Sequence, residues 1–271
     1  MFLFKAERIY LKDADEDIYL DTYAVNDKTL TPRDAILVIP GGGYGHVSLD
    51  REGEKTALAY AARGINAFVL NYSVGKDVVF PAQLECAALA MNYIKSHAGE
   101  YNVNPERVFV LGFSAGGHLA GLLTTMHGFA EERFGLEKDM ARPKGTVFCY
   151  PVVSAFPPTN ENTFQNLLKK SFSSLTDEER IIYSIEMNVN SSTPPAFMWH
   201  TATDNVVPVQ GTLKLALAYA NAGAPFTLRV YPYGPHAIAL GTDYSNSGRE
   251  NFIQPMAAKW LDDSVEWMKT V

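Results

Sequence analysis

The hydrophobic positions of the chain fall into short runs separated by longer amphipathic stretches. Six runs rich in β-branched and aromatic residues predict strands at 35–39, 65–70, 107–111, 145–150, 196–200 and 226–231. Because these runs are continuously apolar rather than alternating, they are typical of strands that are buried on both faces of a parallel sheet. Two earlier segments, 8–11 and 17–25, predict an N-terminal hairpin.

Apolar residues at helical spacing occupy the intervals between the predicted strands. They predict helices at 52–63, 81–97, 115–126, 209–222 and 251–268. Glycine follows two of these segments, at Gly64 and Gly223, where it favours the end of a helix. The alternation of strands and helices predicts an α/β fold, in which helices and right-handed crossovers flank a mostly parallel central sheet.

Residues 154–195 interrupt this alternation. Pairs of prolines stand near both ends, and two short helices are predicted inside, at 161–170 and 176–185. A segment of about forty residues within a compact domain is usually functional or disordered. We interpret it as a small helical cap over the carboxyl edge of the sheet, the alternative being a surface insertion without a role. The chain 1–271 is then expected to form a single domain.

The charge balance excludes some classes of partner. The 271 residues include 23 Lys and Arg against 30 Asp and Glu, a net charge of −7. This acidic chain lacks the cationic patch with which proteins neutralise nucleic-acid phosphates, so no nucleic-acid partner is expected. The longest apolar runs have about five residues, whereas a membrane span needs ~20. The N-terminus shows no signal-peptide pattern, and we expect a cytoplasmic protein that does not contact membranes.

The two cysteines, Cys86 and Cys149, lie in segments that are predicted to be buried. Their spacing matches no metal-binding or redox motif. Cysteine is among the most frequently buried residue types. We therefore expect two buried free thiols.

Residues 112–116, Gly-Phe-Ser-Ala-Gly, form a G-x-S-x-G motif between a predicted strand and a predicted helix. In this context the serine occupies a tight turn that exposes its hydroxyl, and the two glycines remove Cβ atoms that would crowd the turn. The N-terminus of the following helix favours the negative charge that develops during acyl transfer. The motif indicates that Ser114 is a nucleophile.

A serine nucleophile requires a base, and the base requires an acid that orients it. In this fold the chain order is Ser, then Asp or Glu, then His. His236 follows the last predicted strand and is the expected base, whereas His200 ends an apolar strand and is expected to be structural. Asp204, on the loop after that strand, is the expected acid, although Asp-Asn also suits an ordinary turn. His118 is expected to pack beneath the serine turn.

Residues 40–44, Pro-Gly-Gly-Gly-Tyr, follow the first core strand. Glycine lets the backbone approach a substrate, so the amides of Gly42 and Gly43, together with that of Ala115, are the expected oxyanion hole. The run is not a phosphate loop, because no G-K-[ST] follows it. His46 is expected to be exposed or to lie on the rim of the site. The side chains expected in the substrate pocket are Tyr44, Phe113 and Trp199, with core packing the alternative for Trp199.

The chain resembles the α/β-hydrolase superfamily in its carboxylesterase branch, and particularly the bacterial acetyl-xylan-esterase-like hydrolases of sugar esters. The matching stretches are 40–44, 112–120, 194–208 and 231–236, and the similarity extends from about residue 35. The resemblance implies a Ser-Asp-His triad that releases small acyl groups, often acetate from carbohydrate, without a metal or organic cofactor. Two departures stand out. Pro40 replaces the histidine of hormone-sensitive-lipase-like esterases, and Ala237 replaces a common glycine.

These observations predict an enzyme that hydrolyses short-chain acyl esters, acting on short acetylated xylo-oligosaccharides through an acyl-enzyme. An arylformamidase or lactonase differs from it only in substrate. A peptidase of the prolyl-oligopeptidase type normally carries a further domain or an acidic pair, and a non-catalytic binding protein normally has a broken triad. The tryptophans of the last predicted helix, Trp260 and Trp267, leave open whether it packs on the core or on the partner in a homodimer.

Overall fold

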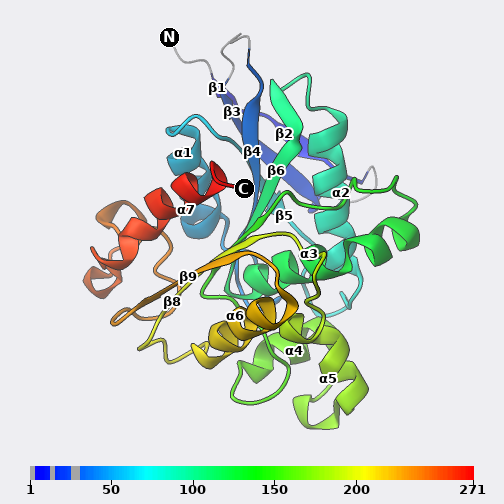
Figure 1. Ribbon diagram of the computed structural model, residues 1–271, viewed down its shortest axis with the longest axis vertical. Coiled ribbons are helices and arrows are strands. Elements are labelled where there is room, and N and C mark those ends of the chain that lie inside the picture. The colour runs from blue at the N-terminus through cyan, green and yellow to red at the C-terminus, as the bar shows by residue number, and fades with distance from the viewer. Residues whose placement is uncertain (1–3, 13–15, 26–30) are drawn as a thin grey trace.

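A computed structural model describes residues 4–12, 16–25 and 31–271, and a twisted sheet forms its centre (Figure 1). The strand order is β1-β3-β5-β4-β6-β7-β8-β9, and β2 also pairs with β3. The strands are β1 (Phe4–Lys5), β2 (Arg8–Tyr10), β3 (Tyr19–Val25), β4 (Arg33–Ile39), β5 (Asn66–Asn71), β6 (Val103–Phe113), β7 (Thr146–Cys149), β8 (Ala196–Thr201) and β9 (Phe226–Tyr231).

The six predicted core strands form the parallel part of this sheet, from β5 through β4 and β6 to β9. Strand β3 runs antiparallel to β5, β1 and β2. The predicted N-terminal hairpin is confirmed by the β2–β3 pairing, although residues 13–15 between its strands lie outside the described residues. The two cysteines are buried free thiols, as predicted, and burial raises the pKa of both.

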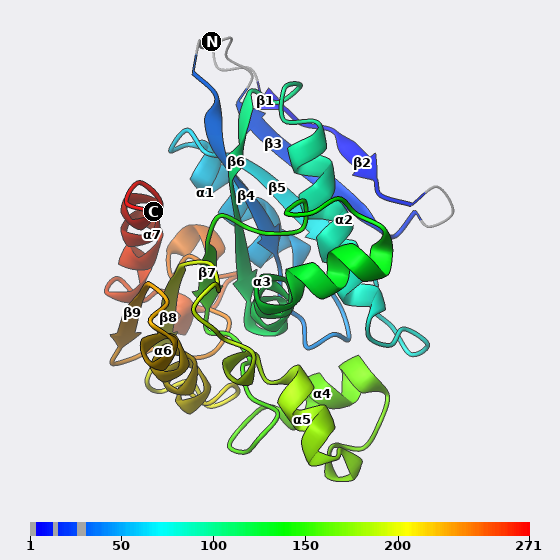
Figure 2. The ribbon, with the colours of Figure 1, turned by 45° about the vertical axis from the view of Figure 1, so that its right-hand side comes forward.

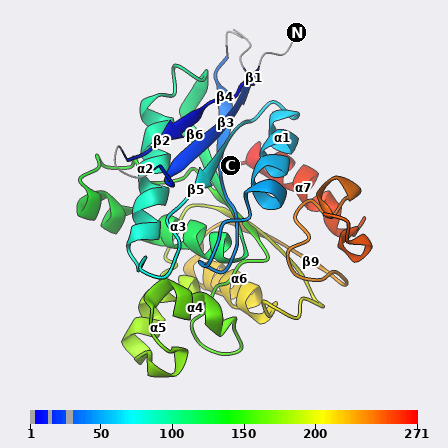
Figure 3. The ribbon, with the colours of Figure 1, turned by 180° about the vertical axis from the view of Figure 1, so that it is seen from behind.

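Helices cover both faces of the sheet. The helices α1 (Lys55–Ala61) and α7 (Trp260–Met268) lie on one face, and α2 (Ala82–Ser96), α3 (Ser114–Phe134) and α6 (Gln210–Ala222) lie on the other (Figures 1 and 3). Trp260 is fully buried and stacks on Trp199 with ring centroids 5.2 Å apart, while Trp267 meets Phe109 edge-on. Both tryptophans of α7 therefore pack on the core of the chain. No helix in the described ranges combines the length and hydrophobicity of a membrane span.

The C-terminal helix is shorter than predicted. The pattern predicts a helix at 251–268, but α7 begins at Trp260, and only short 3₁₀ turns at Glu250–Phe252 and Ala257–Lys259 precede it. Pro255 explains the difference, because proline has no backbone N–H and disfavours helical geometry at the residue before it. The helix predicted at 52–63 also differs, since it begins as a π-helix, Leu49–Glu54, that leads into α1.

The insertion 154–195 forms the helices α4 (Glu161–Leu168) and α5 (Asp177–Tyr183) beyond the carboxyl ends of the parallel strands (Figure 2). Each helix has an N-cap side chain, because Asn160 accepts from the amide of Thr163 and Thr176 forms a capping box with Glu179. Such caps satisfy amides that have no partner within the helix. The insertion is therefore an ordered helical cap over that edge of the sheet.

Candidate active site

Ser114 stands at the sharp junction between β6 and α3. Its φ of +53° is in the left-handed region, which side-chain-bearing residues rarely adopt. A Cβ at Gly112 would lie 2.2 Å from the carbonyl oxygen of Gly116, and a Cβ at Gly116 would lie 2.2 Å from that of Ile39. Only glycine fits these two positions. The sequence G-x-S-x-G thus permits a turn that carries Ser114 into a cavity while β4, β6 and α3 pack closely.

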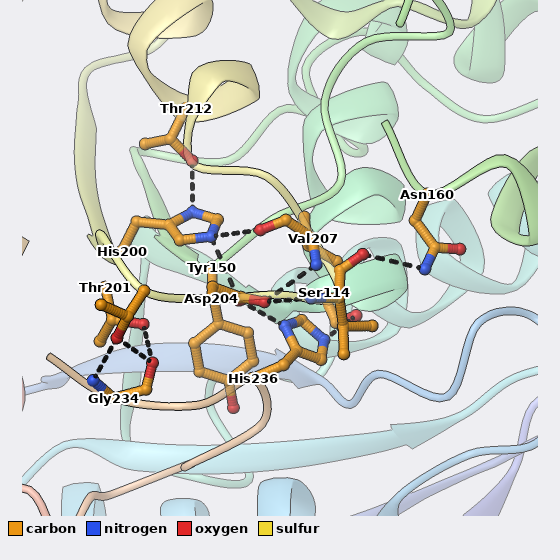
Figure 4. A network of polar contacts seen from close by, with 12 residues as sticks. Ser114, Tyr150, Asn160, His200, Thr201, Asp204, Val207, Thr212, Gly234 and His236 are labelled. Atoms are coloured by element: carbon orange, nitrogen blue, oxygen red, sulfur yellow. Dashed lines mark hydrogen bonds and ion pairs between the residues drawn. The ribbon is translucent and has the colours of Figure 1, made fainter. Parts of the chain in front are cut away.

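The three residues predicted as a triad lie in one hydrogen-bonded line (Figure 4). The Nε2 atom of His236 lies 2.8 Å from Oγ of Ser114, and its Nδ1 atom lies 2.6 Å from Oδ2 of Asp204. Ser114 follows β6, Asp204 follows β8 and His236 follows β9. Because these strands are parallel, the loops at their carboxyl ends meet at the same edge of the sheet.

The surroundings of Asp204 keep its carboxylate ionised. Burial alone would raise its pKa, but hydrogen bonds from His200, His236 and the amide of Val207 outweigh burial and lower the pKa below its ordinary value. The Oδ1 atom accepts from the amides of Val206 and Val207, each at 2.9 Å. With its Nδ1–H donated to this carboxylate, His236 presents Nε2 as an acceptor for the hydroxyl of Ser114.

His200 is fully buried beside the same carboxylate. Its Nε2 atom lies 3.0 Å from the carbonyl oxygen of Val207 and 3.3 Å from Oδ2 of Asp204. Both neighbours are acceptors, so Nε2 carries the proton, and Nδ1 accepts from the hydroxyl of Thr212 at 2.8 Å. His200 is therefore structural, as the sequence indicated. Its contact with Asp204 could not be inferred from the sequence, because residue spacing alone does not show which side chains meet in space.

The glycine loop opens into the same cavity. Gly42 and Gly43 have φ values of +131° and +62°, and both line the cavity together with Ser114. Among the described residues, neither amide has a hydrogen-bond acceptor. The amide of Ala115 belongs to the first turn of α3, where N–H groups lack a partner within the helix. These three predicted donors remain available for a developing negative charge.

One buried carboxylate that the sequence analysis did not single out connects the two loops at the site. Glu52 accepts from the amide of Gly41 through Oε2 and from the hydroxyl of Tyr150 through Oε1, both at 2.8 Å. That hydroxyl accepts in turn from the amide of Ala239 at 3.0 Å, and the ring of Tyr150 meets His236 edge-on at 5.0 Å. In the sequence Glu52 falls within a predicted helix, and nothing in the surrounding pattern of residues marks it as a functional residue.

The cavity at Ser114 has a volume of about 200 Å³. Its lining residues include two from the insertion, Asn160 and Thr163, and the exposed His46 on the rim. The lining residues are Gly42, Gly43, His46, Ser48, Arg51, Glu52, Ser114, Asn160, Thr163, Val206, His236 and Ala237. The insertion also holds the glycine loop, because the side-chain amide of Asn166 donates to the carbonyl oxygen of Gly43 at 2.8 Å.

A larger depression, of about 760 Å³, lies at the opposite, amino edge of the sheet. Its lining includes Pro105 at the start of β6 and Pro194 and Pro195 before β8, but none of the triad residues. Although this depression is larger than the cavity at Ser114, it is not the candidate site, because the three residues predicted as a triad lie elsewhere. Within the described ranges, no three His, Cys, Asp or Glu side chains are grouped so that they could hold a metal ion.

The three side chains expected in the substrate pocket are in the core instead. Tyr44, Phe113 and Trp199 are all fully buried, and none lines the cavity. The hydroxyl of Tyr44 contacts His118, and the rings of Phe113 and Trp199 pack on Trp260. These expectations were wrong because a large aromatic residue near a site is as suitable for the core as for a pocket. The alternative given for Trp199, core packing, is correct.

His118 joins the serine helix to the glycine loop and the insertion. Its Nε2 atom lies 2.8 Å from the carbonyl oxygen of Tyr183 in α5, and its Nδ1 atom lies 2.9 Å from the hydroxyl of Tyr44. The carbonyl can only accept, so Nε2 donates and Nδ1 accepts. Burial lowers the pKa of His118 from 6.5 to about 4, partly offset by the hydrogen bond to Tyr183. The ring is therefore neutral at pH 7.

This lowered pKa predicts that the folded state loses stability in mild acid. Above pH 6.5 neither state protonates His118, but below it the unfolded chain binds a proton that the folded chain does not. Between pH 6.5 and about 4 the free energy of unfolding should decrease by about 3 kcal/mol on account of this residue. Urea unfolding at pH 7 and pH 4.5 measures the loss. It should shrink in His118→Gln and persist in the control His127→Gln, and an equal loss in all three proteins would contradict the prediction.

The mostly parallel sheet, the serine turn after β6 and the Ser-Asp-His order define an α/β hydrolase. A family model described as BD-FAE matches residues 17–218, and the chain belongs to this family. The endo-1,4-β-xylanase B of Butyrivibrio fibrisolvens is 35% identical over 84% of this chain and 36% of its own length. The acetylxylan esterase of Xylanibacter ruminicola is 31% identical over 88% of this chain and 45% of its own length. The chain thus spans less than half the length of both relatives.

Solved structures extend the comparison to the whole chain. The acetyl ester-xyloside bifunctional hydrolase of Caldicellulosiruptor lactoaceticus matches with a TM-score of 0.82 and 29% identity. The match covers 99% of this chain and 97% of that one. The α/β-hydrolase fold expected from the sequence is therefore confirmed, including its mostly parallel sheet.

Proposed function

We propose that this protein is a serine carboxylesterase that removes short acyl groups, and specifically acetyl groups from acetylated sugars or xylo-oligosaccharides. The observation that carries the proposal is the continuous hydrogen-bonded line from Asp204 through His236 to Ser114, which opens on a small cavity. The acetylxylan esterase and the acetyl ester-xyloside hydrolase among the similar proteins support the choice of an acetylated sugar. In this proposal the whole chain acts as one domain.

The proposed reaction begins with acylation of Ser114. Its Oγ attacks the carbonyl carbon while Nε2 of His236, 2.8 Å away, takes the proton. Asp204 stabilises the resulting imidazolium, and the amides of Gly42, Gly43 and Ala115 hold the oxyanion. When the tetrahedral intermediate collapses, His236 gives its proton to the leaving alcohol. The acyl group remains as an ester on Ser114.

Deacylation repeats these steps with water in place of the alcohol. His236 takes a proton from the water, whose oxygen attacks the acyl carbon at the same oxyanion hole. Collapse of the second intermediate breaks the bond to Ser114, which recovers its proton from His236, and releases the carboxylic acid. The residues present supply every proton transfer and charge stabilisation in this cycle.

The size of the cavity and the polar side chains in its wall support a small acyl group on a polar alcohol. A volume of about 200 Å³ suits an acetyl group and part of a sugar ring better than a long acyl chain. The side chains of His46, Ser48, Asn160 and Thr163 provide donors and acceptors for sugar hydroxyls. Long acyl chains would require an apolar tunnel, and the lining offers only Val206 and Ala237 as apolar side chains.

A panel of p-nitrophenyl esters from acetate to decanoate tests this proposal, alongside acetylated xylo-oligosaccharides. We expect kcat/KM to be highest for acetate and to fall by about tenfold or more by octanoate, because the cavity excludes the longer chain. Activity on p-nitrophenyl acetate should be accompanied by release of acetate from the acetylated xylo-oligosaccharides. Rates that rise with chain length would refute the sugar-ester proposal. Inactivity on all esters would refute carboxylesterase activity and favour formamide substrates.

A further inference from the structure

Arg51 brings a guanidinium to the wall of the cavity that holds Ser114. It belongs to the π-helix Leu49–Glu54, and its neighbour Glu52 lines the same cavity. π-Helical turns are rare and are frequent at functional sites. No step of the proposed ester hydrolysis uses Arg51, so its position at the cavity needs a different explanation.

The charge of Arg51 is not balanced by a nearby acid. Its Nε atom is buried without a hydrogen-bond partner, and the side chain forms no ion pair with the described residues. The two adjacent acids are engaged elsewhere. Asp50 lies 3.5 Å from Lys55, and Glu52 accepts from Gly41 and Tyr150. Buried donors normally have a hydrogen-bond partner. Because Arg51 has none among the described residues, its guanidinium can still bind an acceptor from outside the chain.

An aromatic ring holds the guanidinium in place. The Cζ atom of Arg51 lies 5.3 Å from the ring centre of Phe252, in the segment that leads to α7, and Arg249 lies over the same ring at 5.0 Å. Figure 3 shows α1 and α7 on the same face, with this connecting segment beside them. Contact with an aromatic face orients an arginine but leaves its N–H groups unpaired. The donor fork is therefore positioned in advance.

The surface around Arg51 continues from the catalytic cavity into open solvent. A second depression, of about 360 Å³, is lined by Val47, Leu49, Asp50 and Ser247, and it shares Ser48 and Arg51 with the cavity at Ser114. The acetyl group of the proposed substrate is small, and the sugar alcohol is the larger part. We place the alcohol in this direction, from the cavity toward the open depression and past Arg51.

We propose that Arg51 binds a carboxylate on the alcohol part of the substrate, so that acetyl esters of acidic sugars, those carrying a uronate group, are preferred over neutral ones. This inference rests on the proposed esterase function and specifies its substrate class. A guanidinium binds a carboxylate through two parallel hydrogen bonds, which gives both attraction and orientation. Arg51 is thus a specificity-determining residue rather than a participant in the chemistry.

Two aryl acetates that differ in charge test the inference: 4-acetoxybenzoate, which is an anion, and its neutral methyl ester, methyl 4-acetoxybenzoate. The measured quantity is the ratio of kcat/KM for the anion to kcat/KM for the neutral ester. In Arg51→Met, which keeps the aliphatic stem, this ratio should fall by about tenfold relative to the wild-type protein. Arg51→Lys should retain part of the preference, because the charge remains without the fork.

Arg249→Met is the matched control, since it removes the other guanidinium over Phe252 but does not line the cavity. It should leave the ratio unchanged. The wild-type preference for the anion should also weaken as ionic strength rises, since salt screens the attraction. A ratio that is equal in the wild-type, Arg51→Met and Arg51→Lys proteins would overturn the inference while leaving the esterase function intact. If the wild-type protein hydrolyses neither ester but cleaves p-nitrophenyl acetate, only the inference about Arg51 is overturned. Inactivity on every ester overturns both proposals.

Discussion

Replacing Ser114 by alanine should lower kcat/KM for p-nitrophenyl acetate by about 10⁴-fold or more. The hydroxyl of Ser114 is the group that contacts Nε2 of His236, and its loss removes the proposed nucleophile from the cavity. The residual rate would come from binding and from the amides of the oxyanion hole. Since alanine keeps the Cβ atom, the turn at φ +53° is retained and the fold should persist.

Two measurements check this prediction. Steady-state kinetics gives the loss of activity, and the intact mass after treatment with a fluorophosphonate shows whether the serine is modified. The wild-type protein should gain one adduct, and Ser114→Ala should gain none. The control Ser96→Ala removes an exposed hydroxyl on α2 and should behave as the wild type does. A Ser114→Ala protein with wild-type activity would refute the proposed mechanism.

Replacing Asp204 by asparagine should lower kcat by about 10³- to 10⁴-fold. The uncharged amide cannot stabilise the imidazolium of His236, and an NH₂ group facing Nδ1 would favour the wrong tautomer. The side-chain oxygen of asparagine can still accept from the amides of Val206 and Val207, so the loop at the site should keep its support. Because the pKa of Asp204 is lowered, its ionised form should persist well into the acid range in the wild-type protein.

The loss in Asp204→Asn is measured as kcat across a pH series, together with the urea midpoint to establish that the protein is folded. Asp243→Asn is the control, because Asp243 is exposed and its carboxylate accepts from the neighbouring amide of Tyr244, away from the triad residues. It should retain wild-type kcat. A folded Asp204→Asn protein with a loss of less than about tenfold would exclude Asp204 as the acid that orients His236.

The packing around the site explains how its loops keep their positions. Glu52 connects the glycine loop to Tyr150, and Tyr150 connects to the segment after His236 through the amide of Ala239. On the other side, His118 and Asn166 join the serine helix and the glycine loop to the insertion. These buried hydrogen bonds hold loops that come from distant parts of the chain, and such preorganisation favours stabilisation of an oxyanion.

The most reliable inferences from the sequence concerned features whose causes are local. Continuous apolar runs identified the parallel strands, because burial on both faces leaves no polar alternation. The serine turn was recognisable from its local motif, in which a Cβ at Gly112 would meet the carbonyl oxygen of Gly116, although the close contact at Gly116 itself is with Ile39 in β4. Where a local cause was overlooked, as with Pro255, the predicted C-terminal helix was too long.

Only the tertiary structure decided which side chains surround Ser114. The amino-acid types of Tyr44, Phe113 and Trp199 suited a pocket or a core equally, and packing against His118 and Trp260 placed them in the core. Much of the cavity wall instead comes from the π-helix, where a helix was predicted only from residue 52 onward, and from the insertion, which was predicted as a cap without any indication of which side chains face Ser114. The sequence by itself determined the strands and the serine turn, because the residue pattern within each segment imposes them, and the rule for chain order in this fold predicted the three residues that we propose as a triad. The cavity wall depends on contacts between residues far apart in the chain, which no local pattern records.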